Sequence, residues 1–259
     1  MRRMRGIATA FSLFSKIPMP STEWDRHNLR YVLAALPLVG AVIGLVLWGW
    51  SALCGTLGFG LWLRAAGLTL LPVAVTGGLH LDGLADTSDA LASCAPVEVR
   101  REILKDPHTG AFAVIALSSY LLLYFALCTE LAAGCQTLWV TGLIPCISRS
   151  LAGLLSLHAP CAETGGLLDT LSGSRGKGSV LLLSLQLVLF GGAALWLVGW
   201  TGLALLAAGG LSLLRTARIA GRQFGGLSGD LVGYQIQWSE LAMLGAAVFA
   251  QKVVPLWFS

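Results

Sequence analysis

Stretches of about 20 mostly apolar residues recur along this chain of 259 residues. Each is long enough to cross the roughly 30 Å hydrocarbon layer of a membrane as a helix, which satisfies its own backbone hydrogen bonds there. Only 12% of the residues are charged, against about a quarter in soluble domains. The chain is therefore predicted to be an all-α, polytopic membrane bundle of about seven transmembrane helices, forming one domain over residues 1–259. The candidate spans are residues 31–54, 61–79, 110–133, 138–158, 180–197, 201–217 and 240–257. The fifth and sixth could form one broken hairpin.

Basic residues are distributed unevenly between the predicted loops. Of the 17 Lys and Arg residues, only Arg64, Arg149 and Lys252 lie outside four segments that alternate with uncharged loops. Those segments are the N-terminal one and residues 82–106, 163–177 and 215–230. Basic residues gather on the cytoplasmic side of a membrane. We therefore expect a multi-pass protein of the bacterial cytoplasmic membrane, with these segments facing the cytoplasm and the C-terminus outside.

The first 20 residues predict an interfacial amphipathic helix rather than a secretory signal, because their apolar stretch is short and stops at Pro18 and Pro20. The net charge of +4 is too small for a surface that tracks a nucleic acid backbone. We therefore expect the lipid bilayer as a partner and no nucleic acid, and we leave a homo-oligomer open.

Three aspartates occupy one stripe of a predicted helix at the end of the second span. Asp82, Asp86 and Asp89 are related as i, i+4 and i+7, which places them on one helix face. Like charges on one face repel, and a hard divalent cation would compensate them, since Mg²⁺ prefers carboxylate oxygens. The stripe therefore predicts a Mg²⁺ site, and the alternative is a solvated acidic cap. His80 either orients a carboxylate or moves a proton, or is an interfacial histidine with satisfied hydrogen bonds.

Three more charged residues are candidates for binding a phosphate or a metal. Lys105 and Asp106 precede the third span and are suited to a phosphate and a metal, respectively. Arg149 lies inside the fourth span, where an unpaired guanidinium is costly. Arg149 therefore either binds a phosphate or forms a structural pair with one of the aspartates.

A glycine-rich loop before the seventh span combines Gly225 and Gly226 with Ser228 and Asp230. Glycines let backbone N–H groups approach an anionic ligand closely. The loop is predicted to lie on the same face as the aspartates, so we interpret it as a candidate substrate-binding loop. Glycine-rich turns between membrane helices are common, and the alternative is that this one is only a turn.

With these pieces in order, the chain resembles the cobalamin synthase family, the membrane-bound adenosylcobinamide-GDP ribazoletransferases. The resemblance covers nearly the whole sequence, and its most specific block runs from His80 to Asp89. The other matching segments are residues 11–20, residues 36–40 with Gly44, Gly77–Gly78, Lys105–Asp106 with Gly110, Ser148–Arg149, Gly225–Gly226 and residues 228–230.

The resemblance implies a Mg²⁺-dependent transferase that joins adenosylcobinamide-GDP to α-ribazole or its 5′-phosphate and releases GMP, in the last steps of cobalamin biosynthesis. Phosphoryl transfer depends largely on positioning and on electrostatic stabilisation. In the implied site, four aspartates are candidate metal ligands, and three residues are candidate catalytic groups. The metal candidates are Asp82, Asp86, Asp89 and Asp106, and the catalytic candidates are Asp89 as proton acceptor, His80 and Lys105. The substrate-binding candidates are Lys105, Arg149, Gly225, Gly226, Ser228 and Asp230.

Three other functions use similar residues. A CDP-alcohol phosphotransferase and an aspartate-rich prenyltransferase both bind Mg²⁺ through helical aspartates, but the arginine expected after Ala85 is absent, and Asp230 stands alone as a second acidic motif. An ion-coupled transporter would place carboxylates near the bilayer midplane rather than on one face. A purely structural membrane subunit gives no reason for the acidic stripe.

Overall fold

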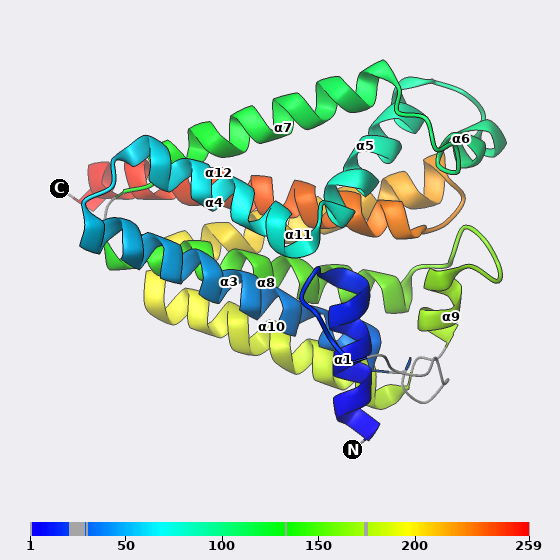
Figure 1. The fold of residues 1–259 in the computed structure, drawn as a ribbon, viewed down its shortest axis with the longest axis horizontal. Helices are drawn as coiled ribbons and strands as arrows, with labels where there is room; N and C mark the ends of the chain where they lie inside the picture. Colours follow the sequence, from blue (N-terminus) through cyan, green and yellow to red (C-terminus); the bar gives the residue numbers. More distant parts are fainter. Residues whose placement is uncertain (1, 21–28, 30, 133, 174–175, 259) are drawn as a thin grey trace.

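The computed structural model describes residues 2–20, 29, 31–132, 134–173 and 176–258. Within these residues the regular structure is helical, and the one β-type contact is an isolated parallel bridge between Cys161 and Leu227. The predicted all-α bundle is confirmed (Figure 1). The helices are α1 (Arg2–Phe14), α3 (Val32–Leu57), α4 (Leu61–Thr76), α5 (Leu79–Ala92), α6 (Val97–Ile103), α7 (Ala111–Glu130), α8 (Cys135–His158), α9 (Leu167–Gly173), α10 (Lys177–Val198), α11 (Trp200–Gln223) and α12 (Gly229–Phe258).

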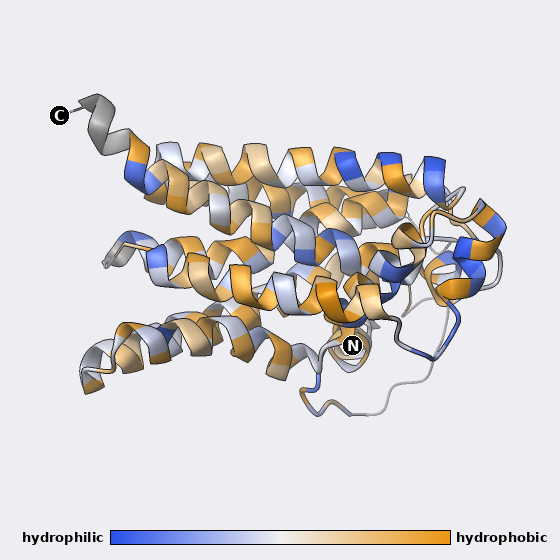
Figure 2. Cartoon of the chain, turned by 90° about the horizontal axis from the view of Figure 1, so that it is seen from above, coloured by the Kyte–Doolittle hydropathy of each residue, from blue (hydrophilic) through white to orange (hydrophobic). Residues whose placement is uncertain are grey.

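Among the described residues, five helices are long and apolar enough to cross a membrane, namely α3, α7, α8, α10 and α11. They correspond to the first, third, fourth, fifth and sixth predicted spans, and α10 and α11 are two helices that meet at Gly199. Apolar residues run along the helices of the bundle (Figure 2), and Leu185, Val188 and Trp196 of α10 are exposed as lipid-facing side chains would be. The chain is a multi-pass membrane protein.

The second predicted span is broken. α4 ends at Thr76, and α5 leaves it at 94°, so the two form one further candidate span only when they are taken together. Gly77 and Gly78 make this break, because both have left-handed conformations, with φ of 66° and 81°. Glycine adopts such conformations without the steric cost that a Cβ would add. The break turns the acidic stripe out of the line of α4.

The seventh predicted span is the second part of a longer helix, α12, which begins at Gly229. This helix is not among the five apolar ones, and its first half carries polar side chains. Gln235 is fully buried and Glu240 is 3% exposed, so these polar groups face protein rather than water or lipid. The prediction of about seven spans is therefore supported for five helices, or for six with the bent pair.

The contact between α3 and α8 forms the centre of the bundle. In the apolar stretch of α8, 89% of the residues are buried, against 17% in α10. A Cβ added at Gly40 or Gly44 of α3 would lie 2.3 Å from the carbonyl oxygen of Pro145 or Gly142, respectively, in α8. Small residues four positions apart allow two membrane helices to approach this closely.

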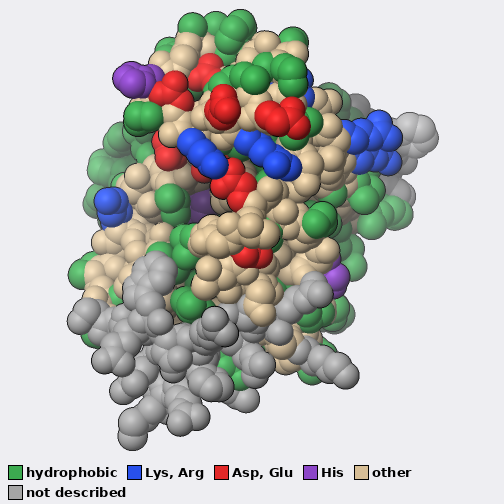
Figure 3. Space-filling model, turned by 90° about the vertical axis from the view of Figure 1, so that its right-hand side faces the viewer, with side chains coloured by type: hydrophobic (Ala, Val, Ile, Leu, Met, Phe, Trp, Pro, Cys, Tyr) green, Lys and Arg blue, Asp and Glu red, His purple; other side chains and the backbone are tan. Residues whose placement is uncertain are grey.

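The two ends of the bundle differ in polarity. Residues 93–110, 159–173 and 224–228 gather with α1 at one end, which we call the polar end, and the C-terminal end of α12 lies at the other (Figure 1). Seen from the polar end, acidic and basic side chains surround a hollow (Figure 3). α1 packs there through Ala10 and Phe11, which are buried. The polar end therefore unites loops that are far apart in the sequence.

Replacing Gly44 by alanine is expected to destabilise the fold, because the new Cβ would lie 2.3 Å from the carbonyl oxygen of Gly142. Overpacking of this kind typically costs about 1–3 kcal/mol. Gly49 is the matched control on the same helix, since a Cβ there meets nothing within 4 Å and alanine favours a helix over glycine. The measurement is thermal unfolding of both variants in detergent. Equal unfolding temperatures would contradict the close α3–α8 contact.

Candidate active site

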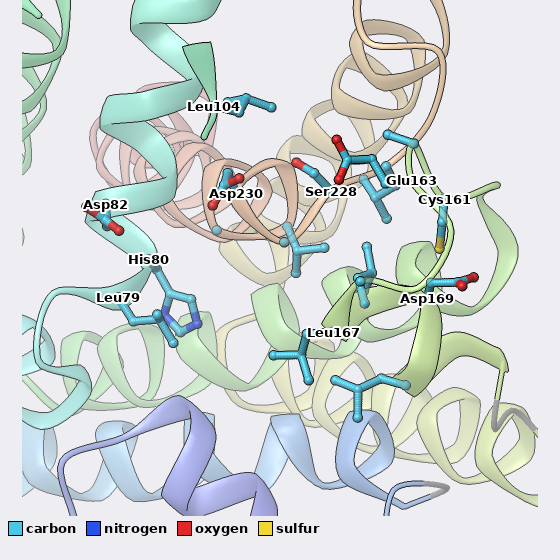
Figure 4. Close-up of a pocket in the computed structure, with 18 of the residues that line it drawn as sticks. Leu79, His80, Asp82, Leu104, Cys161, Glu163, Leu167, Asp169, Ser228 and Asp230 are labelled. Atoms are coloured by element: carbon cyan, nitrogen blue, oxygen red, sulfur yellow. The ribbon is translucent and has the colours of Figure 1, made fainter. Parts of the chain in front are cut away.

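A cavity of about 480 Å³ opens at the polar end, and we call it the main cavity. Asp82 and His80 of α5 line it on one side, and Ser228 and Asp230 line it at the start of α12 (Figure 4). Leucines of α1, α3 and α9 supply much of its apolar wall. The main cavity therefore offers both charged groups and apolar surface to a ligand.

Two glycines bring α5 and α12 together beside the main cavity. A Cβ added at Gly83 would lie 2.6 Å from the carbonyl oxygen of Asp230, and one at Gly233 would lie 3.1 Å from the carbonyl oxygen of His80. Because neither glycine carries a side chain, the backbones of the two helices touch. This contact brings the start of α12 to the acidic face of α5.

The resulting acidic cluster consists of Asp82, Asp86 and Asp230. The negative charges of Asp82, Asp230 and, to a smaller extent, Asp89 act on the carboxyl group of Asp86, which is one turn farther along α5 than Asp82. Within the described part of the chain none of the three forms an ion pair. Nor do three His, Cys, Asp or Glu side chains of the described residues form a group that could hold a metal ion by themselves. The cluster is negative and uncompensated.

Asp89 and Asp106, two predicted metal ligands, bind other groups instead. The Asp89 carboxylate accepts backbone N–H groups at the start of α7, from Gly110 at 2.7 Å and from Ala113 at 2.9 Å. Asp106 accepts the backbone N–H of His108 at 2.9 Å, and this hydrogen bond lowers the pKa of the Asp106 carboxyl. Their assignment as metal ligands stays a prediction. Asp89 anchors α7 to α5, and Asp106 closes an exposed turn outside the main cavity.

His80 and Lys105 both line the main cavity. His80 is 4% exposed, and its Nδ1 atom has no hydrogen-bond partner in the described structure, which does not support a histidine with satisfied hydrogen bonds. The Lys105 ammonium lies 2.7 Å from the Glu163 carboxylate. An exposed ion pair like this contributes little to stability. It nevertheless engages the ammonium of Lys105, which the sequence analysis predicts to bind a phosphate.

The glycine-rich loop shapes the polar end without lining the main cavity at its two glycines. A Cβ at Gly225 would lie 2.4 Å from a terminal nitrogen of Arg101, and one at Gly226 would lie 2.5 Å from the backbone nitrogen of Ala162. These glycines therefore allow neighbouring segments to pack closely. Ser228 does line the cavity, and its hydroxyl accepts a backbone N–H in the first turn of α12 at 3.3 Å.

Arg149 lies inside the bundle rather than at the polar end, and it does not line the main cavity. It is fully buried and forms an ion pair with Glu240 of α12. The Ser148 hydroxyl donates to the same carboxylate at 3.0 Å. The predicted structural pair therefore exists, but its acid is Glu240 rather than an aspartate. The alternative assignment of Arg149 to phosphate binding stays a prediction.

Several cavity residues were missed by the sequence interpretation. Glu163 and Asp169 line the main cavity from the segment that joins α8 to α10, opposite Asp82 (Figure 4). Asp169 accepts the backbone N–H of Gly165 at 2.8 Å and so shapes its own loop. No spacing or motif in this segment indicates a site, since its position follows only from the packing of the bundle.

A model of the family described as cobalamin-5-phosphate synthase matches residues 6–248. The chain belongs to this family. An adenosylcobinamide-GDP ribazoletransferase of Lachnoclostridium phytofermentans is 36% identical over 98% of this chain and 97% of its own length. Relatives with the same name from Pseudomonas syringae pv. syringae and Geobacillus thermodenitrificans are 37% and 36% identical, and the matches cover 90% and 95% of this chain and 93% and 96% of the relatives. No solved structure matches the chain.

Membership of the cobalamin-5-phosphate synthase family confirms the resemblance found in the sequence and makes the chain a transferase of cobalamin biosynthesis. The comparisons give no support to a CDP-alcohol phosphotransferase, a prenyltransferase, a transporter or a structural subunit. The match extends over nearly all of the chain, so the polar end and the helices that carry it belong to one family unit.

Replacing Arg149 by leucine is expected to destabilise the protein by about 3–5 kcal/mol, because Glu240 would remain as a buried, unpaired charge. The double variant Arg149→Leu, Glu240→Leu should recover much of this loss, since it removes both charges. Unfolding in detergent measures the effect. A single variant with unchanged stability and a raised KM would instead indicate that Arg149 binds a phosphate.

Asp89→Asn is expected to lower stability by about 1–3 kcal/mol, because an amide can accept only one of the two N–H groups that the carboxylate now accepts. Glu98→Gln, which changes an exposed carboxylate of α6, is the control and should leave stability unchanged. Thermal unfolding in detergent, followed together with turnover, checks this role. Lost turnover with unchanged unfolding would restore Asp89 as a proton acceptor.

Proposed function

We propose that this transferase joins adenosylcobinamide-GDP to α-ribazole or α-ribazole 5′-phosphate, with Mg²⁺ and with release of GMP. The observation that carries the proposal is the acidic cluster of Asp82, Asp86 and Asp230 beside a cavity of mixed polarity. Transfer from a diphosphate requires its negative charge to be neutralised, which such a cluster achieves through a bound cation. The names of the relatives contain the same two substrates, cobinamide-GDP and ribazole.

The acidic cluster fits a Mg²⁺ ion that protein and substrate hold together. Mg²⁺ commonly takes one or two carboxylates, several waters and substrate phosphate oxygens rather than a cage of protein ligands. The three carboxylates repel one another, and the described residues form no complete metal site by themselves. Both observations are consistent with a Mg²⁺ ion whose other ligands are waters and substrate oxygens. We assign Asp82 and Asp86 as ligands, and Asp230 as a further ligand or a contact to the second substrate. The bound ion would supply charge neutralisation at the diphosphate.

Proton removal is the second task of the site. A ribose hydroxyl of the acceptor attacks the phosphorus on the cobinamide side, the bond from that phosphorus to GMP breaks, and the hydroxyl loses its proton. Since Asp89 is occupied by backbone N–H groups, His80 is our candidate to accept this proton at an imidazole nitrogen. Its ring lines the main cavity together with Asp82, and the apolar wall limits the access of water.

We place the enzyme in the bacterial cytoplasmic membrane, with the main cavity open to the cytoplasm. Only three of the 17 basic residues lie outside the four segments expected on that side. The described parts of those segments form the polar end (Figure 3). The positive-inside rule therefore supports this orientation. Cobinamide-GDP carries a charged diphosphate, so a cavity that opens to the cytoplasm gives it direct access.

Asp82→Asn and Asp86→Asn are each expected to lower GMP release by about 100-fold or more, because each removes a charged group that acts on the diphosphate. Asp106→Asn is the matched control and should keep GMP release close to normal, since Asp106 lies outside the main cavity. The assay follows GMP release from cobinamide-GDP in liposomes across a Mg²⁺ titration. Turnover that persists after removal of Mg²⁺ by a chelator would disprove the metal assignment.

A further inference from the structure

A second cavity, of about 630 Å³, lies on the other side of the start of α5. Its walls come from the end of α1, the break between α4 and α5, and α7, with Lys16, Gly77 and Thr109 among the lining residues. Asp82 lines both this second cavity and the main cavity. The two cavities therefore meet at a residue of the acidic cluster.

Lys16 is held in a defined place beside this junction. Its backbone N–H donates to the carbonyl of Val75 at 2.8 Å, which ties the turn after α1 to the end of α4. Its aliphatic stem lies across Gly77, since a Cβ added at Gly77 would be 2.3 Å from Lys16 Cε. The stem therefore lies over the helix break, and Lys16 is one of the residues that line the second cavity.

Lys16 also differs from the other cations that line the two cavities, Arg101 and Lys105. Arg101 donates from Nε to the carbonyl of Phe224 at 2.7 Å, and Lys105 is paired with Glu163. Within the described residues the Lys16 ammonium has no hydrogen bond or ion pair. Of these three cations, Lys16 is the one whose side chain has neither a hydrogen bond nor an ion pair with a described residue.

We propose that Lys16 binds the phosphate group of a phosphorylated nucleoside acceptor, which occupies the second cavity while the diphosphate substrate occupies the main cavity. The inference rests on the proposed function and adds to it a place for each substrate. Two substrates that react at one metal must both reach it, and Asp82 is the carboxylate that both cavities share. A free nucleoside lacks the phosphate, so Lys16 gives the enzyme a preference for the 5′-phosphate form.

The test compares the KM values of α-ribazole 5′-phosphate and α-ribazole in the full-length enzyme in liposomes, with GMP release as the readout. In Lys16→Met, KM for the phosphorylated acceptor should rise by about 10- to 100-fold, which is the change in affinity expected from the loss of a hydrogen bond to a charged group. KM for α-ribazole should stay unchanged, and Lys16→Arg should keep most of the preference. Lys252→Met is the control and should leave the ratio of the two KM values unchanged, since this exposed lysine pairs with Glu130 away from both cavities.

A glycine pair provides a second, independent measurement. Gly77→Ala and Gly78→Ala impose similar backbone strain, because both positions have positive φ. Only the Cβ at Gly77 meets the Lys16 stem, while nothing lies within 4 Å of one at Gly78. Gly77→Ala should therefore reduce the preference for the phosphorylated acceptor more than Gly78→Ala.

The outcomes separate this inference from the proposed function. An active wild-type enzyme whose KM ratio is the same in Lys16→Met overturns the role of Lys16 and leaves the transferase activity standing. Equal changes of both KM values in Lys16→Met also overturn it, since they indicate a structural effect. Absence of GMP release from the wild-type enzyme with either acceptor would overturn the proposed function itself.

Discussion

The backbone contact between α5 and α12 is the constraint on which the site depends. At Gly83 and Gly233 the two helices touch without intervening side chains, and this contact sets Asp230 against the acidic face of α5. α12 is fixed at a second point, where Glu240 pairs with the buried Arg149 of α8. A side chain at either glycine would separate the helices and open the acidic cluster. Packing of small residues in the bundle thus determines the distance between charges at its polar end.

Apolar length predicts much of the fold, because a membrane selects helices by length and composition. It predicts α3, α7, α8, α10 and α11, but not the break between α4 and α5, since two glycines at the end of an apolar run do not reveal their left-handed conformations. It also misses the first half of α12, where Gln235 and Glu240 are buried against protein. The sequence of a polar helix that other helices surround contains no long apolar run, so apolar length does not predict such a helix.

The sequence also predicts part of the candidate site. Helical spacing places Asp82 and Asp86 on one face, and the charge pattern of the loops correctly puts Asp230 at the same end. The roles of Asp89 and Arg149 do not follow from such patterns, because their partners belong to helices that only the folded bundle brings close. Two opposite charges inside apolar spans were the available signal for the Arg149 pair.

A comparison of the acidic side chains by their partners supports our proposal that the acidic cluster binds a cation. Five acidic side chains at the polar end or inside the bundle have a hydrogen-bond or ion-pair partner, namely Asp89, Asp106, Asp169, Glu163 and Glu240. Asp82, Asp86 and Asp230 form no ion pair with a described residue, and their charges act on one another, although this repulsion costs stability. The buried carboxylate of Glu240 shows that this fold can place a cation beside an acidic side chain. The three aspartates beside the main cavity have no such partner among the described residues, which favours a function for their negative charge, such as the binding of a metal-bound diphosphate.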